Sequence, residues 1–200
     1  MVRTELLASI RATVVTLLLT GLAYPLFVTG AAQVLAPRRA NGTLALDDSG
    51  RPVGSELIAQ PFANAGYLQP RPSAAGEKGY DAAGSSGSNL GPTSKALHDR
   101  AEKEAQRLLQ ENPDASGPVP AELIAASGSG LDPHLSPAAA LWQVARIAHA
   151  RNVEPKRVRS IIESAIEGRD LGFLGEPRIN VLLVNLALDR HFGRPPIAAR

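Results

Sequence analysis

The sequence predicts an α+β protein, with a single N-terminal transmembrane helix followed by one soluble α+β domain. Two observations predict it. Residues 12–36 form an uncharged apolar stretch, and a predicted hairpin after it precedes amphipathic helical patterns in the second half of the chain. We therefore expect a short tail at residues 1–11, a transmembrane anchor at residues 12–36 and a soluble α+β domain at residues 37–200.

The apolar stretch is long enough to cross a bilayer, because a helix rises about 1.5 Å per residue and the hydrocarbon core is roughly 30 Å thick. Pro25 is expected to kink this helix. Gly21, Ala23 and several threonines offer a face of small side chains that suits packing against another helix, although such residues are also common in membrane helices in general. A cleaved signal peptide is the alternative, but its apolar region is usually only about 7–15 residues long.

Charge does not decide the orientation of the anchor. Arg3 and Arg11 precede the stretch, and Arg38 and Arg39 follow it closely. The short N-terminal tail and the long polar domain are compatible with a cytoplasmic N-terminus and a domain on the other side.

Composition excludes several classes of function. A formal net charge of +2 without a basic cluster gives no reason to expect nucleic acid as a partner. The absence of cysteine excludes disulfides and thiolate metal sites. Four histidines with no close pair predict no metal site.

Turn residues mark the start of the soluble domain. Asn41-Gly42-Thr43 matches a glycosylation acceptor, but a turn is the favoured interpretation. Thr43–Leu46 and Arg51–Val53 flank the run Asp47-Asp48-Ser49-Gly50, which predicts a small hairpin.

Residues 54–92 are rich in Gly, Pro, Ser and Asn and show no helical period. Such a segment is either disordered or fixed by particular contacts. Five side chains are spaced through it like groups that hold a long loop in place or touch a partner: Tyr67, Arg71, Tyr80, Asp81 and Asn89.

Four helices are expected after this segment. The first covers Lys95–Gln110, with Thr93 or Ser94 as its cap, and the second covers Pro137–Arg151, with Ser136 as its cap. The third starts at Glu154-Pro155 and is ended by Gly168, and the fourth lies within Ile179–Phe192 and starts near Asn180. On the second helix, we expect Arg146, His149 and Arg151 to form a solvated face.

A cluster of polar residues invites a hydrolase interpretation, because Ser127, Ser129, Asp132 and His134 lie within a short segment. The nucleophile-elbow pattern G-x-S-x-G is absent, however, and catalytic triads are assembled from distant parts of a fold. The favoured interpretation is an ordered turn in which Asp132 and Ser136 accept hydrogen bonds from backbone N–H groups. We assign no catalytic residue and no metal ligand.

The segment GSSGSNLG at residues 84–91 offers exposed N–H groups, as phosphate-binding loops do. Neither the P-loop pattern nor the Rossmann glycine spacing is present. Gly87, Ser88, Asn89 and Gly91 are therefore candidates for nucleotide contact on loop composition alone.

Several longer motifs, in order along the whole chain, carry a family resemblance. They are residues 54–60 (GSELIAQ), 67–81 around RPSAAG, 87–92 (GSNLGP), 127–137 (SGSGLDPHLSP), 175–181 (GEPRINV) and 185–189 (NLALD). The chain resembles the KdpC family, the C subunit of the Kdp-type potassium-transporting P-type ATPase of bacteria. Ala59, Leu68 and Ser86 depart from the family pattern, and the last departure weakens the nucleotide interpretation.

The resemblance implies an accessory subunit of a high-affinity ATP-driven potassium uptake pump, in the cell inner membrane, with its main domain in the periplasm. It implies two protein partners, a channel-like potassium-binding subunit and a P-type ATPase subunit, besides membrane lipid. The implied role is to support assembly and to raise the ATP affinity of the ATPase subunit, as a catalytic chaperone. No cofactor is expected on this chain itself, and ATP would act through the complex.

The phosphorylatable D-K-T-G of P-type pumps is absent, so we expect this chain not to be the enzyme of the complex. A domain outside the membrane cannot touch cytoplasmic ATP, so an effect on ATP affinity would pass through the anchor. The candidate partner-binding residues are Tyr67, Arg71, Tyr80 and Asp81. They lie on the loop of residues 66–92, which is expected to dock on the channel-like subunit together with the anchor face. A membrane-anchored cell-envelope hydrolase using Ser129 and His134 is the alternative, and a structural anchor protein with no ligand is a third hypothesis.

Overall fold

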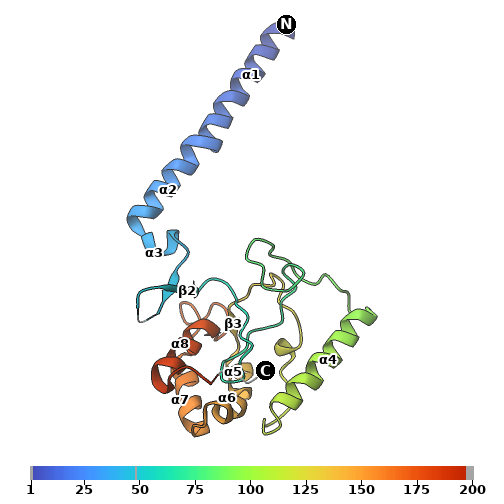
Figure 1. Ribbon diagram of the computed structural model, residues 1–200. Coiled ribbons are helices and arrows are strands. Elements are labelled where there is room, and N and C mark those ends of the chain that lie inside the picture. Colours follow the sequence, from blue (N-terminus) through green and yellow to red (C-terminus); the bar gives the residue numbers. More distant parts are fainter. Residues whose placement is uncertain (1, 48, 197–200) are drawn as a thin grey trace. The chain divides into compact units, whose positions relative to one another are not determined.

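The computed structural model describes residues 2–47 and 49–196 (Figure 1). The chain divides into two units, residues 1–44 and residues 45–200. The first is helical and the second combines helices with two small sheets, so the predicted α+β class is confirmed.

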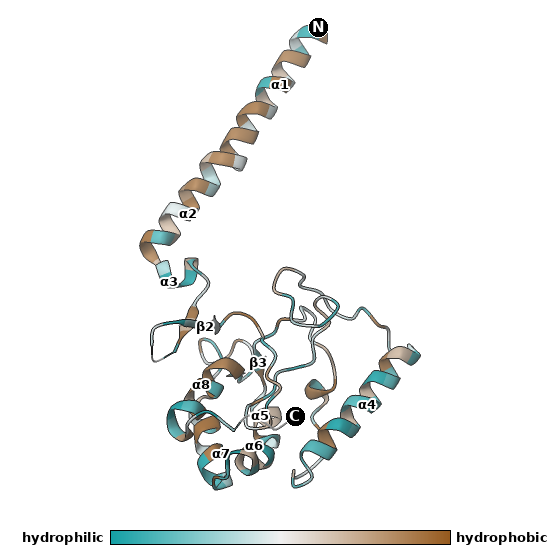
Figure 2. Ribbon diagram, viewed as in Figure 1, coloured by the Kyte–Doolittle hydropathy of each residue, from teal (hydrophilic) through white to brown (hydrophobic). Residues whose placement is uncertain are grey.

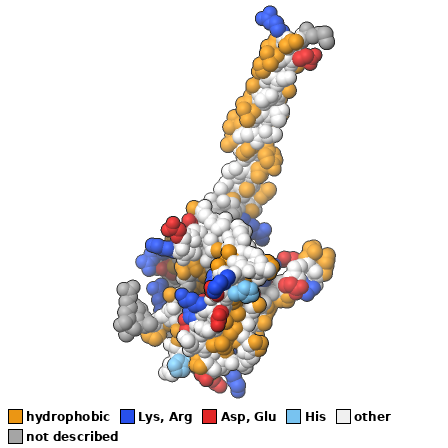
Figure 3. Space-filling model, turned by 90° about the vertical axis from the view of Figure 1, so that its right-hand side faces the viewer, with side chains coloured by type: hydrophobic (Ala, Val, Ile, Leu, Met, Phe, Trp, Pro, Cys, Tyr) orange, Lys and Arg blue, Asp and Glu red, His pale blue; other side chains and the backbone are white. Residues whose placement is uncertain are grey.

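The first unit is built on a long helix. It comprises α1 (Val2–Leu18), the π-helical turn η1 (Leu19–Ala23) and α2 (Tyr24–Leu35), and the short helix α3 (Pro37–Ala40) follows. In the part of the chain that the structure describes, Val2–Leu35 is the one helix that is long and apolar enough to cross a membrane, and the mean hydropathy of its most apolar window is 1.8 (Figure 2). None of that window is buried. Hydrophobic side chains follow one another along the surface of this helix (Figure 3). Regular helix thus begins ahead of the predicted anchor boundary at residue 12.

A π-helical turn precedes Pro25. The N–H of Tyr24 donates to the carbonyl of Leu19, five residues earlier, where an α-helix would bond four residues back. Pro25 has no N–H, so the regular hydrogen-bond ladder cannot continue through it. A widened turn therefore lies just before Pro25, and the predicted kink itself stays a prediction.

The predicted hairpin is confirmed. Strands β1 (Leu44–Leu46) and β2 (Pro52–Ser55) form a two-stranded sheet. Asp47 shapes the turn, since its Oδ1 accepts hydrogen bonds from the backbone N–H groups of Ser49 and Arg51, both at 2.9 Å. Asp48, part of the predicted turn, lies outside the described residues.

The predicted helices are present, with some changes at their ends. They are α4 (Lys95–Glu111), α5 (Pro137–Trp142), α6 (Val144–Arg151), α7 (Pro155–Ser164) and α8 (Val181–Phe192), besides the 3₁₀ turn η2 (Ala121–Leu123). The expected single helix over residues 137–151 is interrupted at Gln143. The predicted end of α7 at Gly168 is wrong, because the backbone of Glu167 instead exchanges hydrogen bonds with Arg178.

The expected cap Ser136 and Asn180, near which the last helix was expected to start, hold their helices by side-chain hydrogen bonds. Ser136 Oγ accepts from the N–H of Ala139, and Asn180 Oδ1 accepts from the N–H of Leu183. Ser94 is the N-cap residue of α4, but its hydroxyl makes no capping bond. The sequence did not predict the pairing of β3 (His134–Leu135) with β4 (Ile179–Asn180), an antiparallel contact that joins the starts of α5 and α8.

The core lies among α5, α6, α7 and α8. Leu135, Ile147, Val158, Ile162, Ile179, Val184 and Leu188 are all less than 2% exposed. Helix α4 lies at the edge of the domain and buries Leu108 alone among its residues (Figure 1). The packed helices therefore form the base of the domain, and a long segment without regular structure lies against them.

Candidate functional site

That segment is the long loop, which we define as residues 56–94, and it contains no helix or strand. It carries all four predicted partner-binding residues: Tyr67, Arg71, Tyr80 and Asp81. Because the loop has no regular ladder of backbone hydrogen bonds, its order must come from contacts with the helices.

Two buried amides hold the centre of the long loop. Asn185 Oδ1 accepts from the N–H of Leu68 at 2.7 Å, and Asn185 Nδ2 donates to the Leu68 carbonyl at 2.9 Å. Gln143 does the same for Gln69, at 2.9 and 3.0 Å. Leu68 is 0% exposed. These paired bonds replace the ladder of a strand, so this part of the loop is fixed by contacts and is not a disordered linker.

Arg146 adds a buried cation to this support. Its guanidinium donates to the carbonyls of Ala65 at 2.6 Å and Tyr67 at 3.1 Å, and to Gln143 Oε1 at 2.6 Å. The residue is 5% exposed, and burial lowers its pKa to about 10. The prediction that Arg146 belongs to a solvated face is therefore wrong.

The same prediction is wrong for Arg151, whose side chain is 2% exposed, while His149 is exposed as expected. Arg151 Nη2 lies 2.8 Å from Asp189 Oδ1, and its guanidinium carbon lies 5.1 Å from the centre of the Tyr67 ring. The Tyr67 hydroxyl donates to Asp189 Oδ2 at 2.8 Å. Burial, and then this bond to Asp189, raise the pKa of Tyr67. Tyr67 thus fastens the loop to α8.

Arg71 and Tyr80 are brought together. The hydroxyl of Tyr80 donates to the carbonyl of Arg71 at 2.9 Å, and Arg71 Nη1 lies 3.3 Å from Asp132 Oδ2. Burial raises the pKa of Tyr80 to about 12, with the charge of Glu104 adding to it. The Arg71 side chain keeps 25% of its surface exposed. Both residues stabilise the fold of the loop.

Asp81 differs from the other three candidates because it is exposed. Its Oδ1 accepts from the N–H of Ala83 at 2.9 Å, and its own N–H donates to the carbonyl of Ala75 at 3.1 Å. The carboxylate therefore shapes a local turn and still faces solvent.

The polar cluster around His134 is an ordered turn, so the interpretation favoured from its sequence is confirmed. Asp132 Oδ1 accepts from the N–H of His134 at 3.0 Å, and Ser129 Oγ accepts from the N–H of Leu131 at 3.1 Å. The bonds to His134, with Arg71 adding its charge, lower the pKa of Asp132. The hydroxyl oxygen of Ser129 thus stabilises the turn by accepting this backbone hydrogen bond.

The glycine-rich segment packs against this turn. A Cβ on Gly87 would lie 2.8 Å from the carbonyl oxygen of Gly128, and the hydroxyls of Ser85 and Ser86 donate to the carbonyls of Ser129 and Ala74. Gly87 therefore has a packing reason to be glycine. The other nucleotide candidates lie further along: Ser88 is half-buried, Asn89 and Gly91 are exposed, and Asn89 has a φ of 50°.

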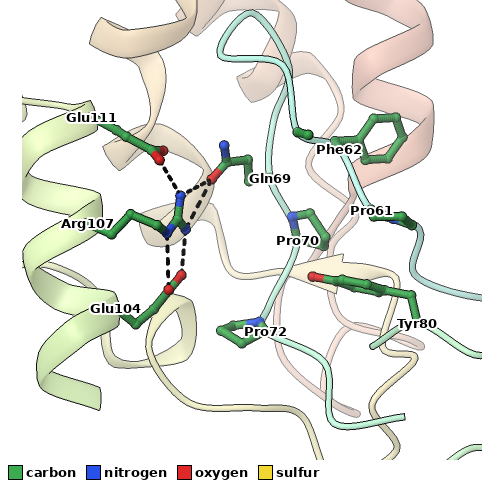
Figure 4. A pocket seen from close by; sticks show the side chains of 10 residues that line it. Pro61, Phe62, Gln69, Pro70, Pro72, Tyr80, Glu104, Arg107 and Glu111 are labelled. Atoms are coloured by element: carbon green, nitrogen blue, oxygen red, sulfur yellow. Dashed lines mark hydrogen bonds and ion pairs between the residues drawn. The ribbon is translucent and has the colours of Figure 1, made fainter. Parts of the chain in front are cut away.

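A pocket of about 350 Å³ separates α4 from the long loop (Figure 4). On the helix side, Arg107 lies between Glu104 and Glu111, at 2.5 and 2.7 Å, and reaches toward Gln69. On the loop side, Tyr80 lines it together with apolar residues: Pro61, Phe62, Pro70 and Pro72. The sequence shows that these three charged residues lie at helical spacing. It does not show that they face the long loop.

The family model described as KdpC, the K⁺-transporting ATPase c chain, matches residues 6–190. The chain belongs to the KdpC family.

Curated relatives cover nearly the whole chain. A potassium-transporting ATPase KdpC subunit of Myxococcus xanthus is 62% identical over 193 residues, which are 96% of this chain and 91% of the relative. KdpC subunits of Nitratidesulfovibrio vulgaris and Rhodospirillum rubrum are 55% and 53% identical over 179 and 175 residues, each match covering 88% of this chain and 90% of the relative.

Sequence reasoning missed the polar groups that hold the long loop: Gln143, Arg146, Arg151, Asn185 and Asp189. Two of them, Asn185 and Asp189, stand in the NLALD motif that carries the family resemblance. An asparagine and an aspartate four residues apart, in a stretch that is apolar from Val181 to Leu188 apart from Asn185, were a signal for buried polar contacts.

Proposed function

We propose that this chain is the accessory subunit of an ATP-driven potassium uptake pump, and that it supports assembly of the complex and raises the ATP affinity of the ATPase subunit. The observation that carries the proposal is the KdpC family match over residues 6–190. Relatives that match it at 53–62% identity are named as KdpC subunits of a potassium-transporting ATPase.

The proposed partners are a channel-like potassium-binding subunit, a P-type ATPase subunit and the surrounding lipid of the cell inner membrane. We place the N-terminus in the cytoplasm and residues 37–200 in the periplasm. A helix over Val2–Leu35 with no buried residue in its apolar window supports a single-pass anchor.

The proposed role is non-catalytic. The chain lacks the D-K-T-G sequence in which P-type pumps are phosphorylated. Ser129, the nucleophile of the alternative hydrolase hypothesis, accepts a hydrogen bond from the Leu131 N–H within an ordered turn. The geometry therefore gives no support to the hydrolase.

An effect on ATP affinity is proposed to be indirect. A periplasmic domain and a cytoplasmic nucleotide are separated by the bilayer, so they can be linked only by a coupling free energy, typically about 1–3 kcal/mol or roughly 5–150-fold in affinity. The π-helical turn Leu19–Ala23 supports the anchor as the route, because such turns are frequent at functional sites in helices. Under this proposal Gly87, Ser88, Asn89 and Gly91 need no contact with ATP.

Residues 66–92 of the long loop are proposed to dock on the channel-like subunit, together with the anchor face. The fixed attachment of the loop to the helices supports this role, since a preordered surface binds at a lower entropic cost. Asp81 is exposed and is the candidate for direct contact, while Tyr67, Arg71 and Tyr80 would act by holding the loop in shape.

The test is to tag the chain, solubilise the membranes gently and identify by mass spectrometry what is retained with it. We expect a P-type ATPase and a multi-span potassium-binding protein. Potassium-stimulated ATPase activity should then be measured against ATP concentration with and without the chain. A lower KM for ATP in its presence supports the chaperone role. An unchanged KM in a fully assembled pump would contradict that role and leave support of assembly as the function of the chain.

A further inference from the structure

The connection between α7 and α8 exposes three large apolar side chains within four residues. Leu171 is 82% exposed, Phe173 69% and Leu174 48%. Single exposed apolar residues are normal, but a cluster of them marks an interaction site. We call these three residues the apolar tip.

The backbone that carries the apolar tip is well held. The N–H groups and carbonyls of Glu167 and Arg178 bond each other at 2.9 and 3.0 Å, and those of Asp170 and Leu174 bond each other at 2.9 Å in both directions. Immediately after Arg178 the chain enters β4, whose two residues are buried at 0% and 4% exposure. The exposed side chains therefore stand on an ordered hairpin-like loop.

The turn at the end of this loop holds a leucine in a conformation that leucine disfavours. Leu171 and Gly172 have φ of 53° and 83°, and the N–H of Phe173 donates to the carbonyl of Asp170 at 3.3 Å. Two successive positive φ values make the mirror image of a type I turn, which favours Asn, Asp or Gly at its first central position. Leucine here costs conformational free energy and gains no burial. Strain of this kind points to a function for the side chain.

The charges of the loop are satisfied within it. Arg178 contacts Glu167 at 3.0 Å and Asp170 at 3.2 Å, and Arg169 contacts Glu176 at 2.7 Å. Two arginines thus meet three carboxylates, and each arginine has an acidic partner. A loop that binds a membrane surface carries cations for lipid phosphates, whereas this one is slightly acidic. The apolar tip therefore suits an apolar, weakly charged surface of a protein better than an anionic lipid surface.

We propose that the apolar tip inserts into an apolar recess on the extracytoplasmic surface of a partner subunit of the pump. This inference rests on the proposed function, which supplies the partner, and adds the place and chemistry of the contact. A few central apolar or aromatic side chains typically carry most of the binding energy of an interface. Leu171 and Phe173, the most exposed of the three, fill that role.

Leu171→Asn is the sharpest test, because asparagine suits the left-handed turn position. In the full chain in mild detergent, its thermal unfolding midpoint should stay equal or rise. The amount of pump subunits retained on the tagged chain should fall at least about tenfold, as for a residue central to an interface. Phe173→Ser should lose partners similarly. The matched control is Leu109→Gln on α4, where another exposed leucine, at 51%, becomes polar and retention should not change.

The outcomes separate this inference from the proposed function. If the wild-type chain retains the pump subunits and Leu171→Asn and Phe173→Ser retain as much, the inference is wrong and the proposed function stands. If the wild-type chain retains neither subunit, the proposed function itself fails. As a second readout, Phe173 replaced by a photoreactive analogue in whole membranes should crosslink to a pump subunit. Adducts with lipid alone or with a second copy of this chain would overturn the inference.

Discussion

The hydroxyl of Tyr67 donates a hydrogen bond to Asp189 Oδ2 at 2.8 Å and joins the long loop to α8 across 122 residues of sequence. Arg151 completes the contact, because it pairs with Asp189 and lies over the Tyr67 ring. The shape of the loop thus depends on side chains of the helices. Changes to those side chains should therefore lower the stability of the domain, and any effect on partner binding should follow from that loss.

Arg151→Met should destabilise the chain by about 3 kcal/mol, because breaking a buried ion pair leaves an uncompensated charge. The change also removes the donor to the carbonyls of Gly66 and Gly193, both at 2.6 Å. Denaturant unfolding of the full chain in mild detergent, followed by the fluorescence of the buried Trp142, measures the loss. Arg159→Met is the control, since its pair with Glu163 is about half exposed and should contribute less than about 1 kcal/mol. Equal effects of the two changes would contradict the role given to Arg151.

Asn185→Ala should cost about 2–4 kcal/mol, because it leaves the buried N–H and carbonyl of Leu68 without their partners. The same unfolding measurement tests it. Gln106→Ala, on the exposed side of α4, should change stability by no more than about 0.5 kcal/mol. A loss at Asn185 no larger than at Gln106 would mean that the loop does not depend on this clamp.

Local signals in the sequence predicted the elements well. Ser136 and Asn180 act as caps because a short polar side chain before an apolar period can bond the first free N–H groups of a helix. The hairpin followed from the turn residues between two apolar runs. These features depend on neighbours in sequence, so they can be read without the fold.

The candidate site was less predictable. Helical periodicity assigned Arg146 and Arg151 to a polar face, and a polar face is normally solvated. Here the face is covered by Ala65, Gly66 and Tyr67, whose backbone carbonyls supply the acceptors. A segment without any period gives no sign of where it will lie, so its partners could not be predicted.

Ionisation of Tyr80 should make stability depend on pH in the alkaline range. Burial raises the pKa of Tyr80 to about 12. In an unfolded chain the phenol loses its proton at about pH 10. A raised pKa contributes stability that is fully present below about pH 10 and is lost as the pH rises toward about 12. Tyr80→Phe should remove this part of the pH dependence, and the difference in tyrosinate absorbance between wild type and variant should titrate near the raised value. A titration midpoint near that of an unfolded chain would show that the phenol is not buried.

Gly87→Ala should destabilise the chain by about 1–3 kcal/mol, because the added Cβ would lie 2.8 Å from the carbonyl oxygen of Gly128. The obstructing atom belongs to the backbone and cannot rotate away, so the two loops must separate. Gly91→Ala is a matched control, since its Cβ would meet nothing within 4 Å and its φ is not positive. Unfolding midpoints of both variants should be measured with and without ATP. A loss of stability that is confined to Gly87→Ala and does not depend on ATP would show that packing explains this glycine. Two variants that are as stable as the wild type but have both lost ATP binding would restore the nucleotide interpretation.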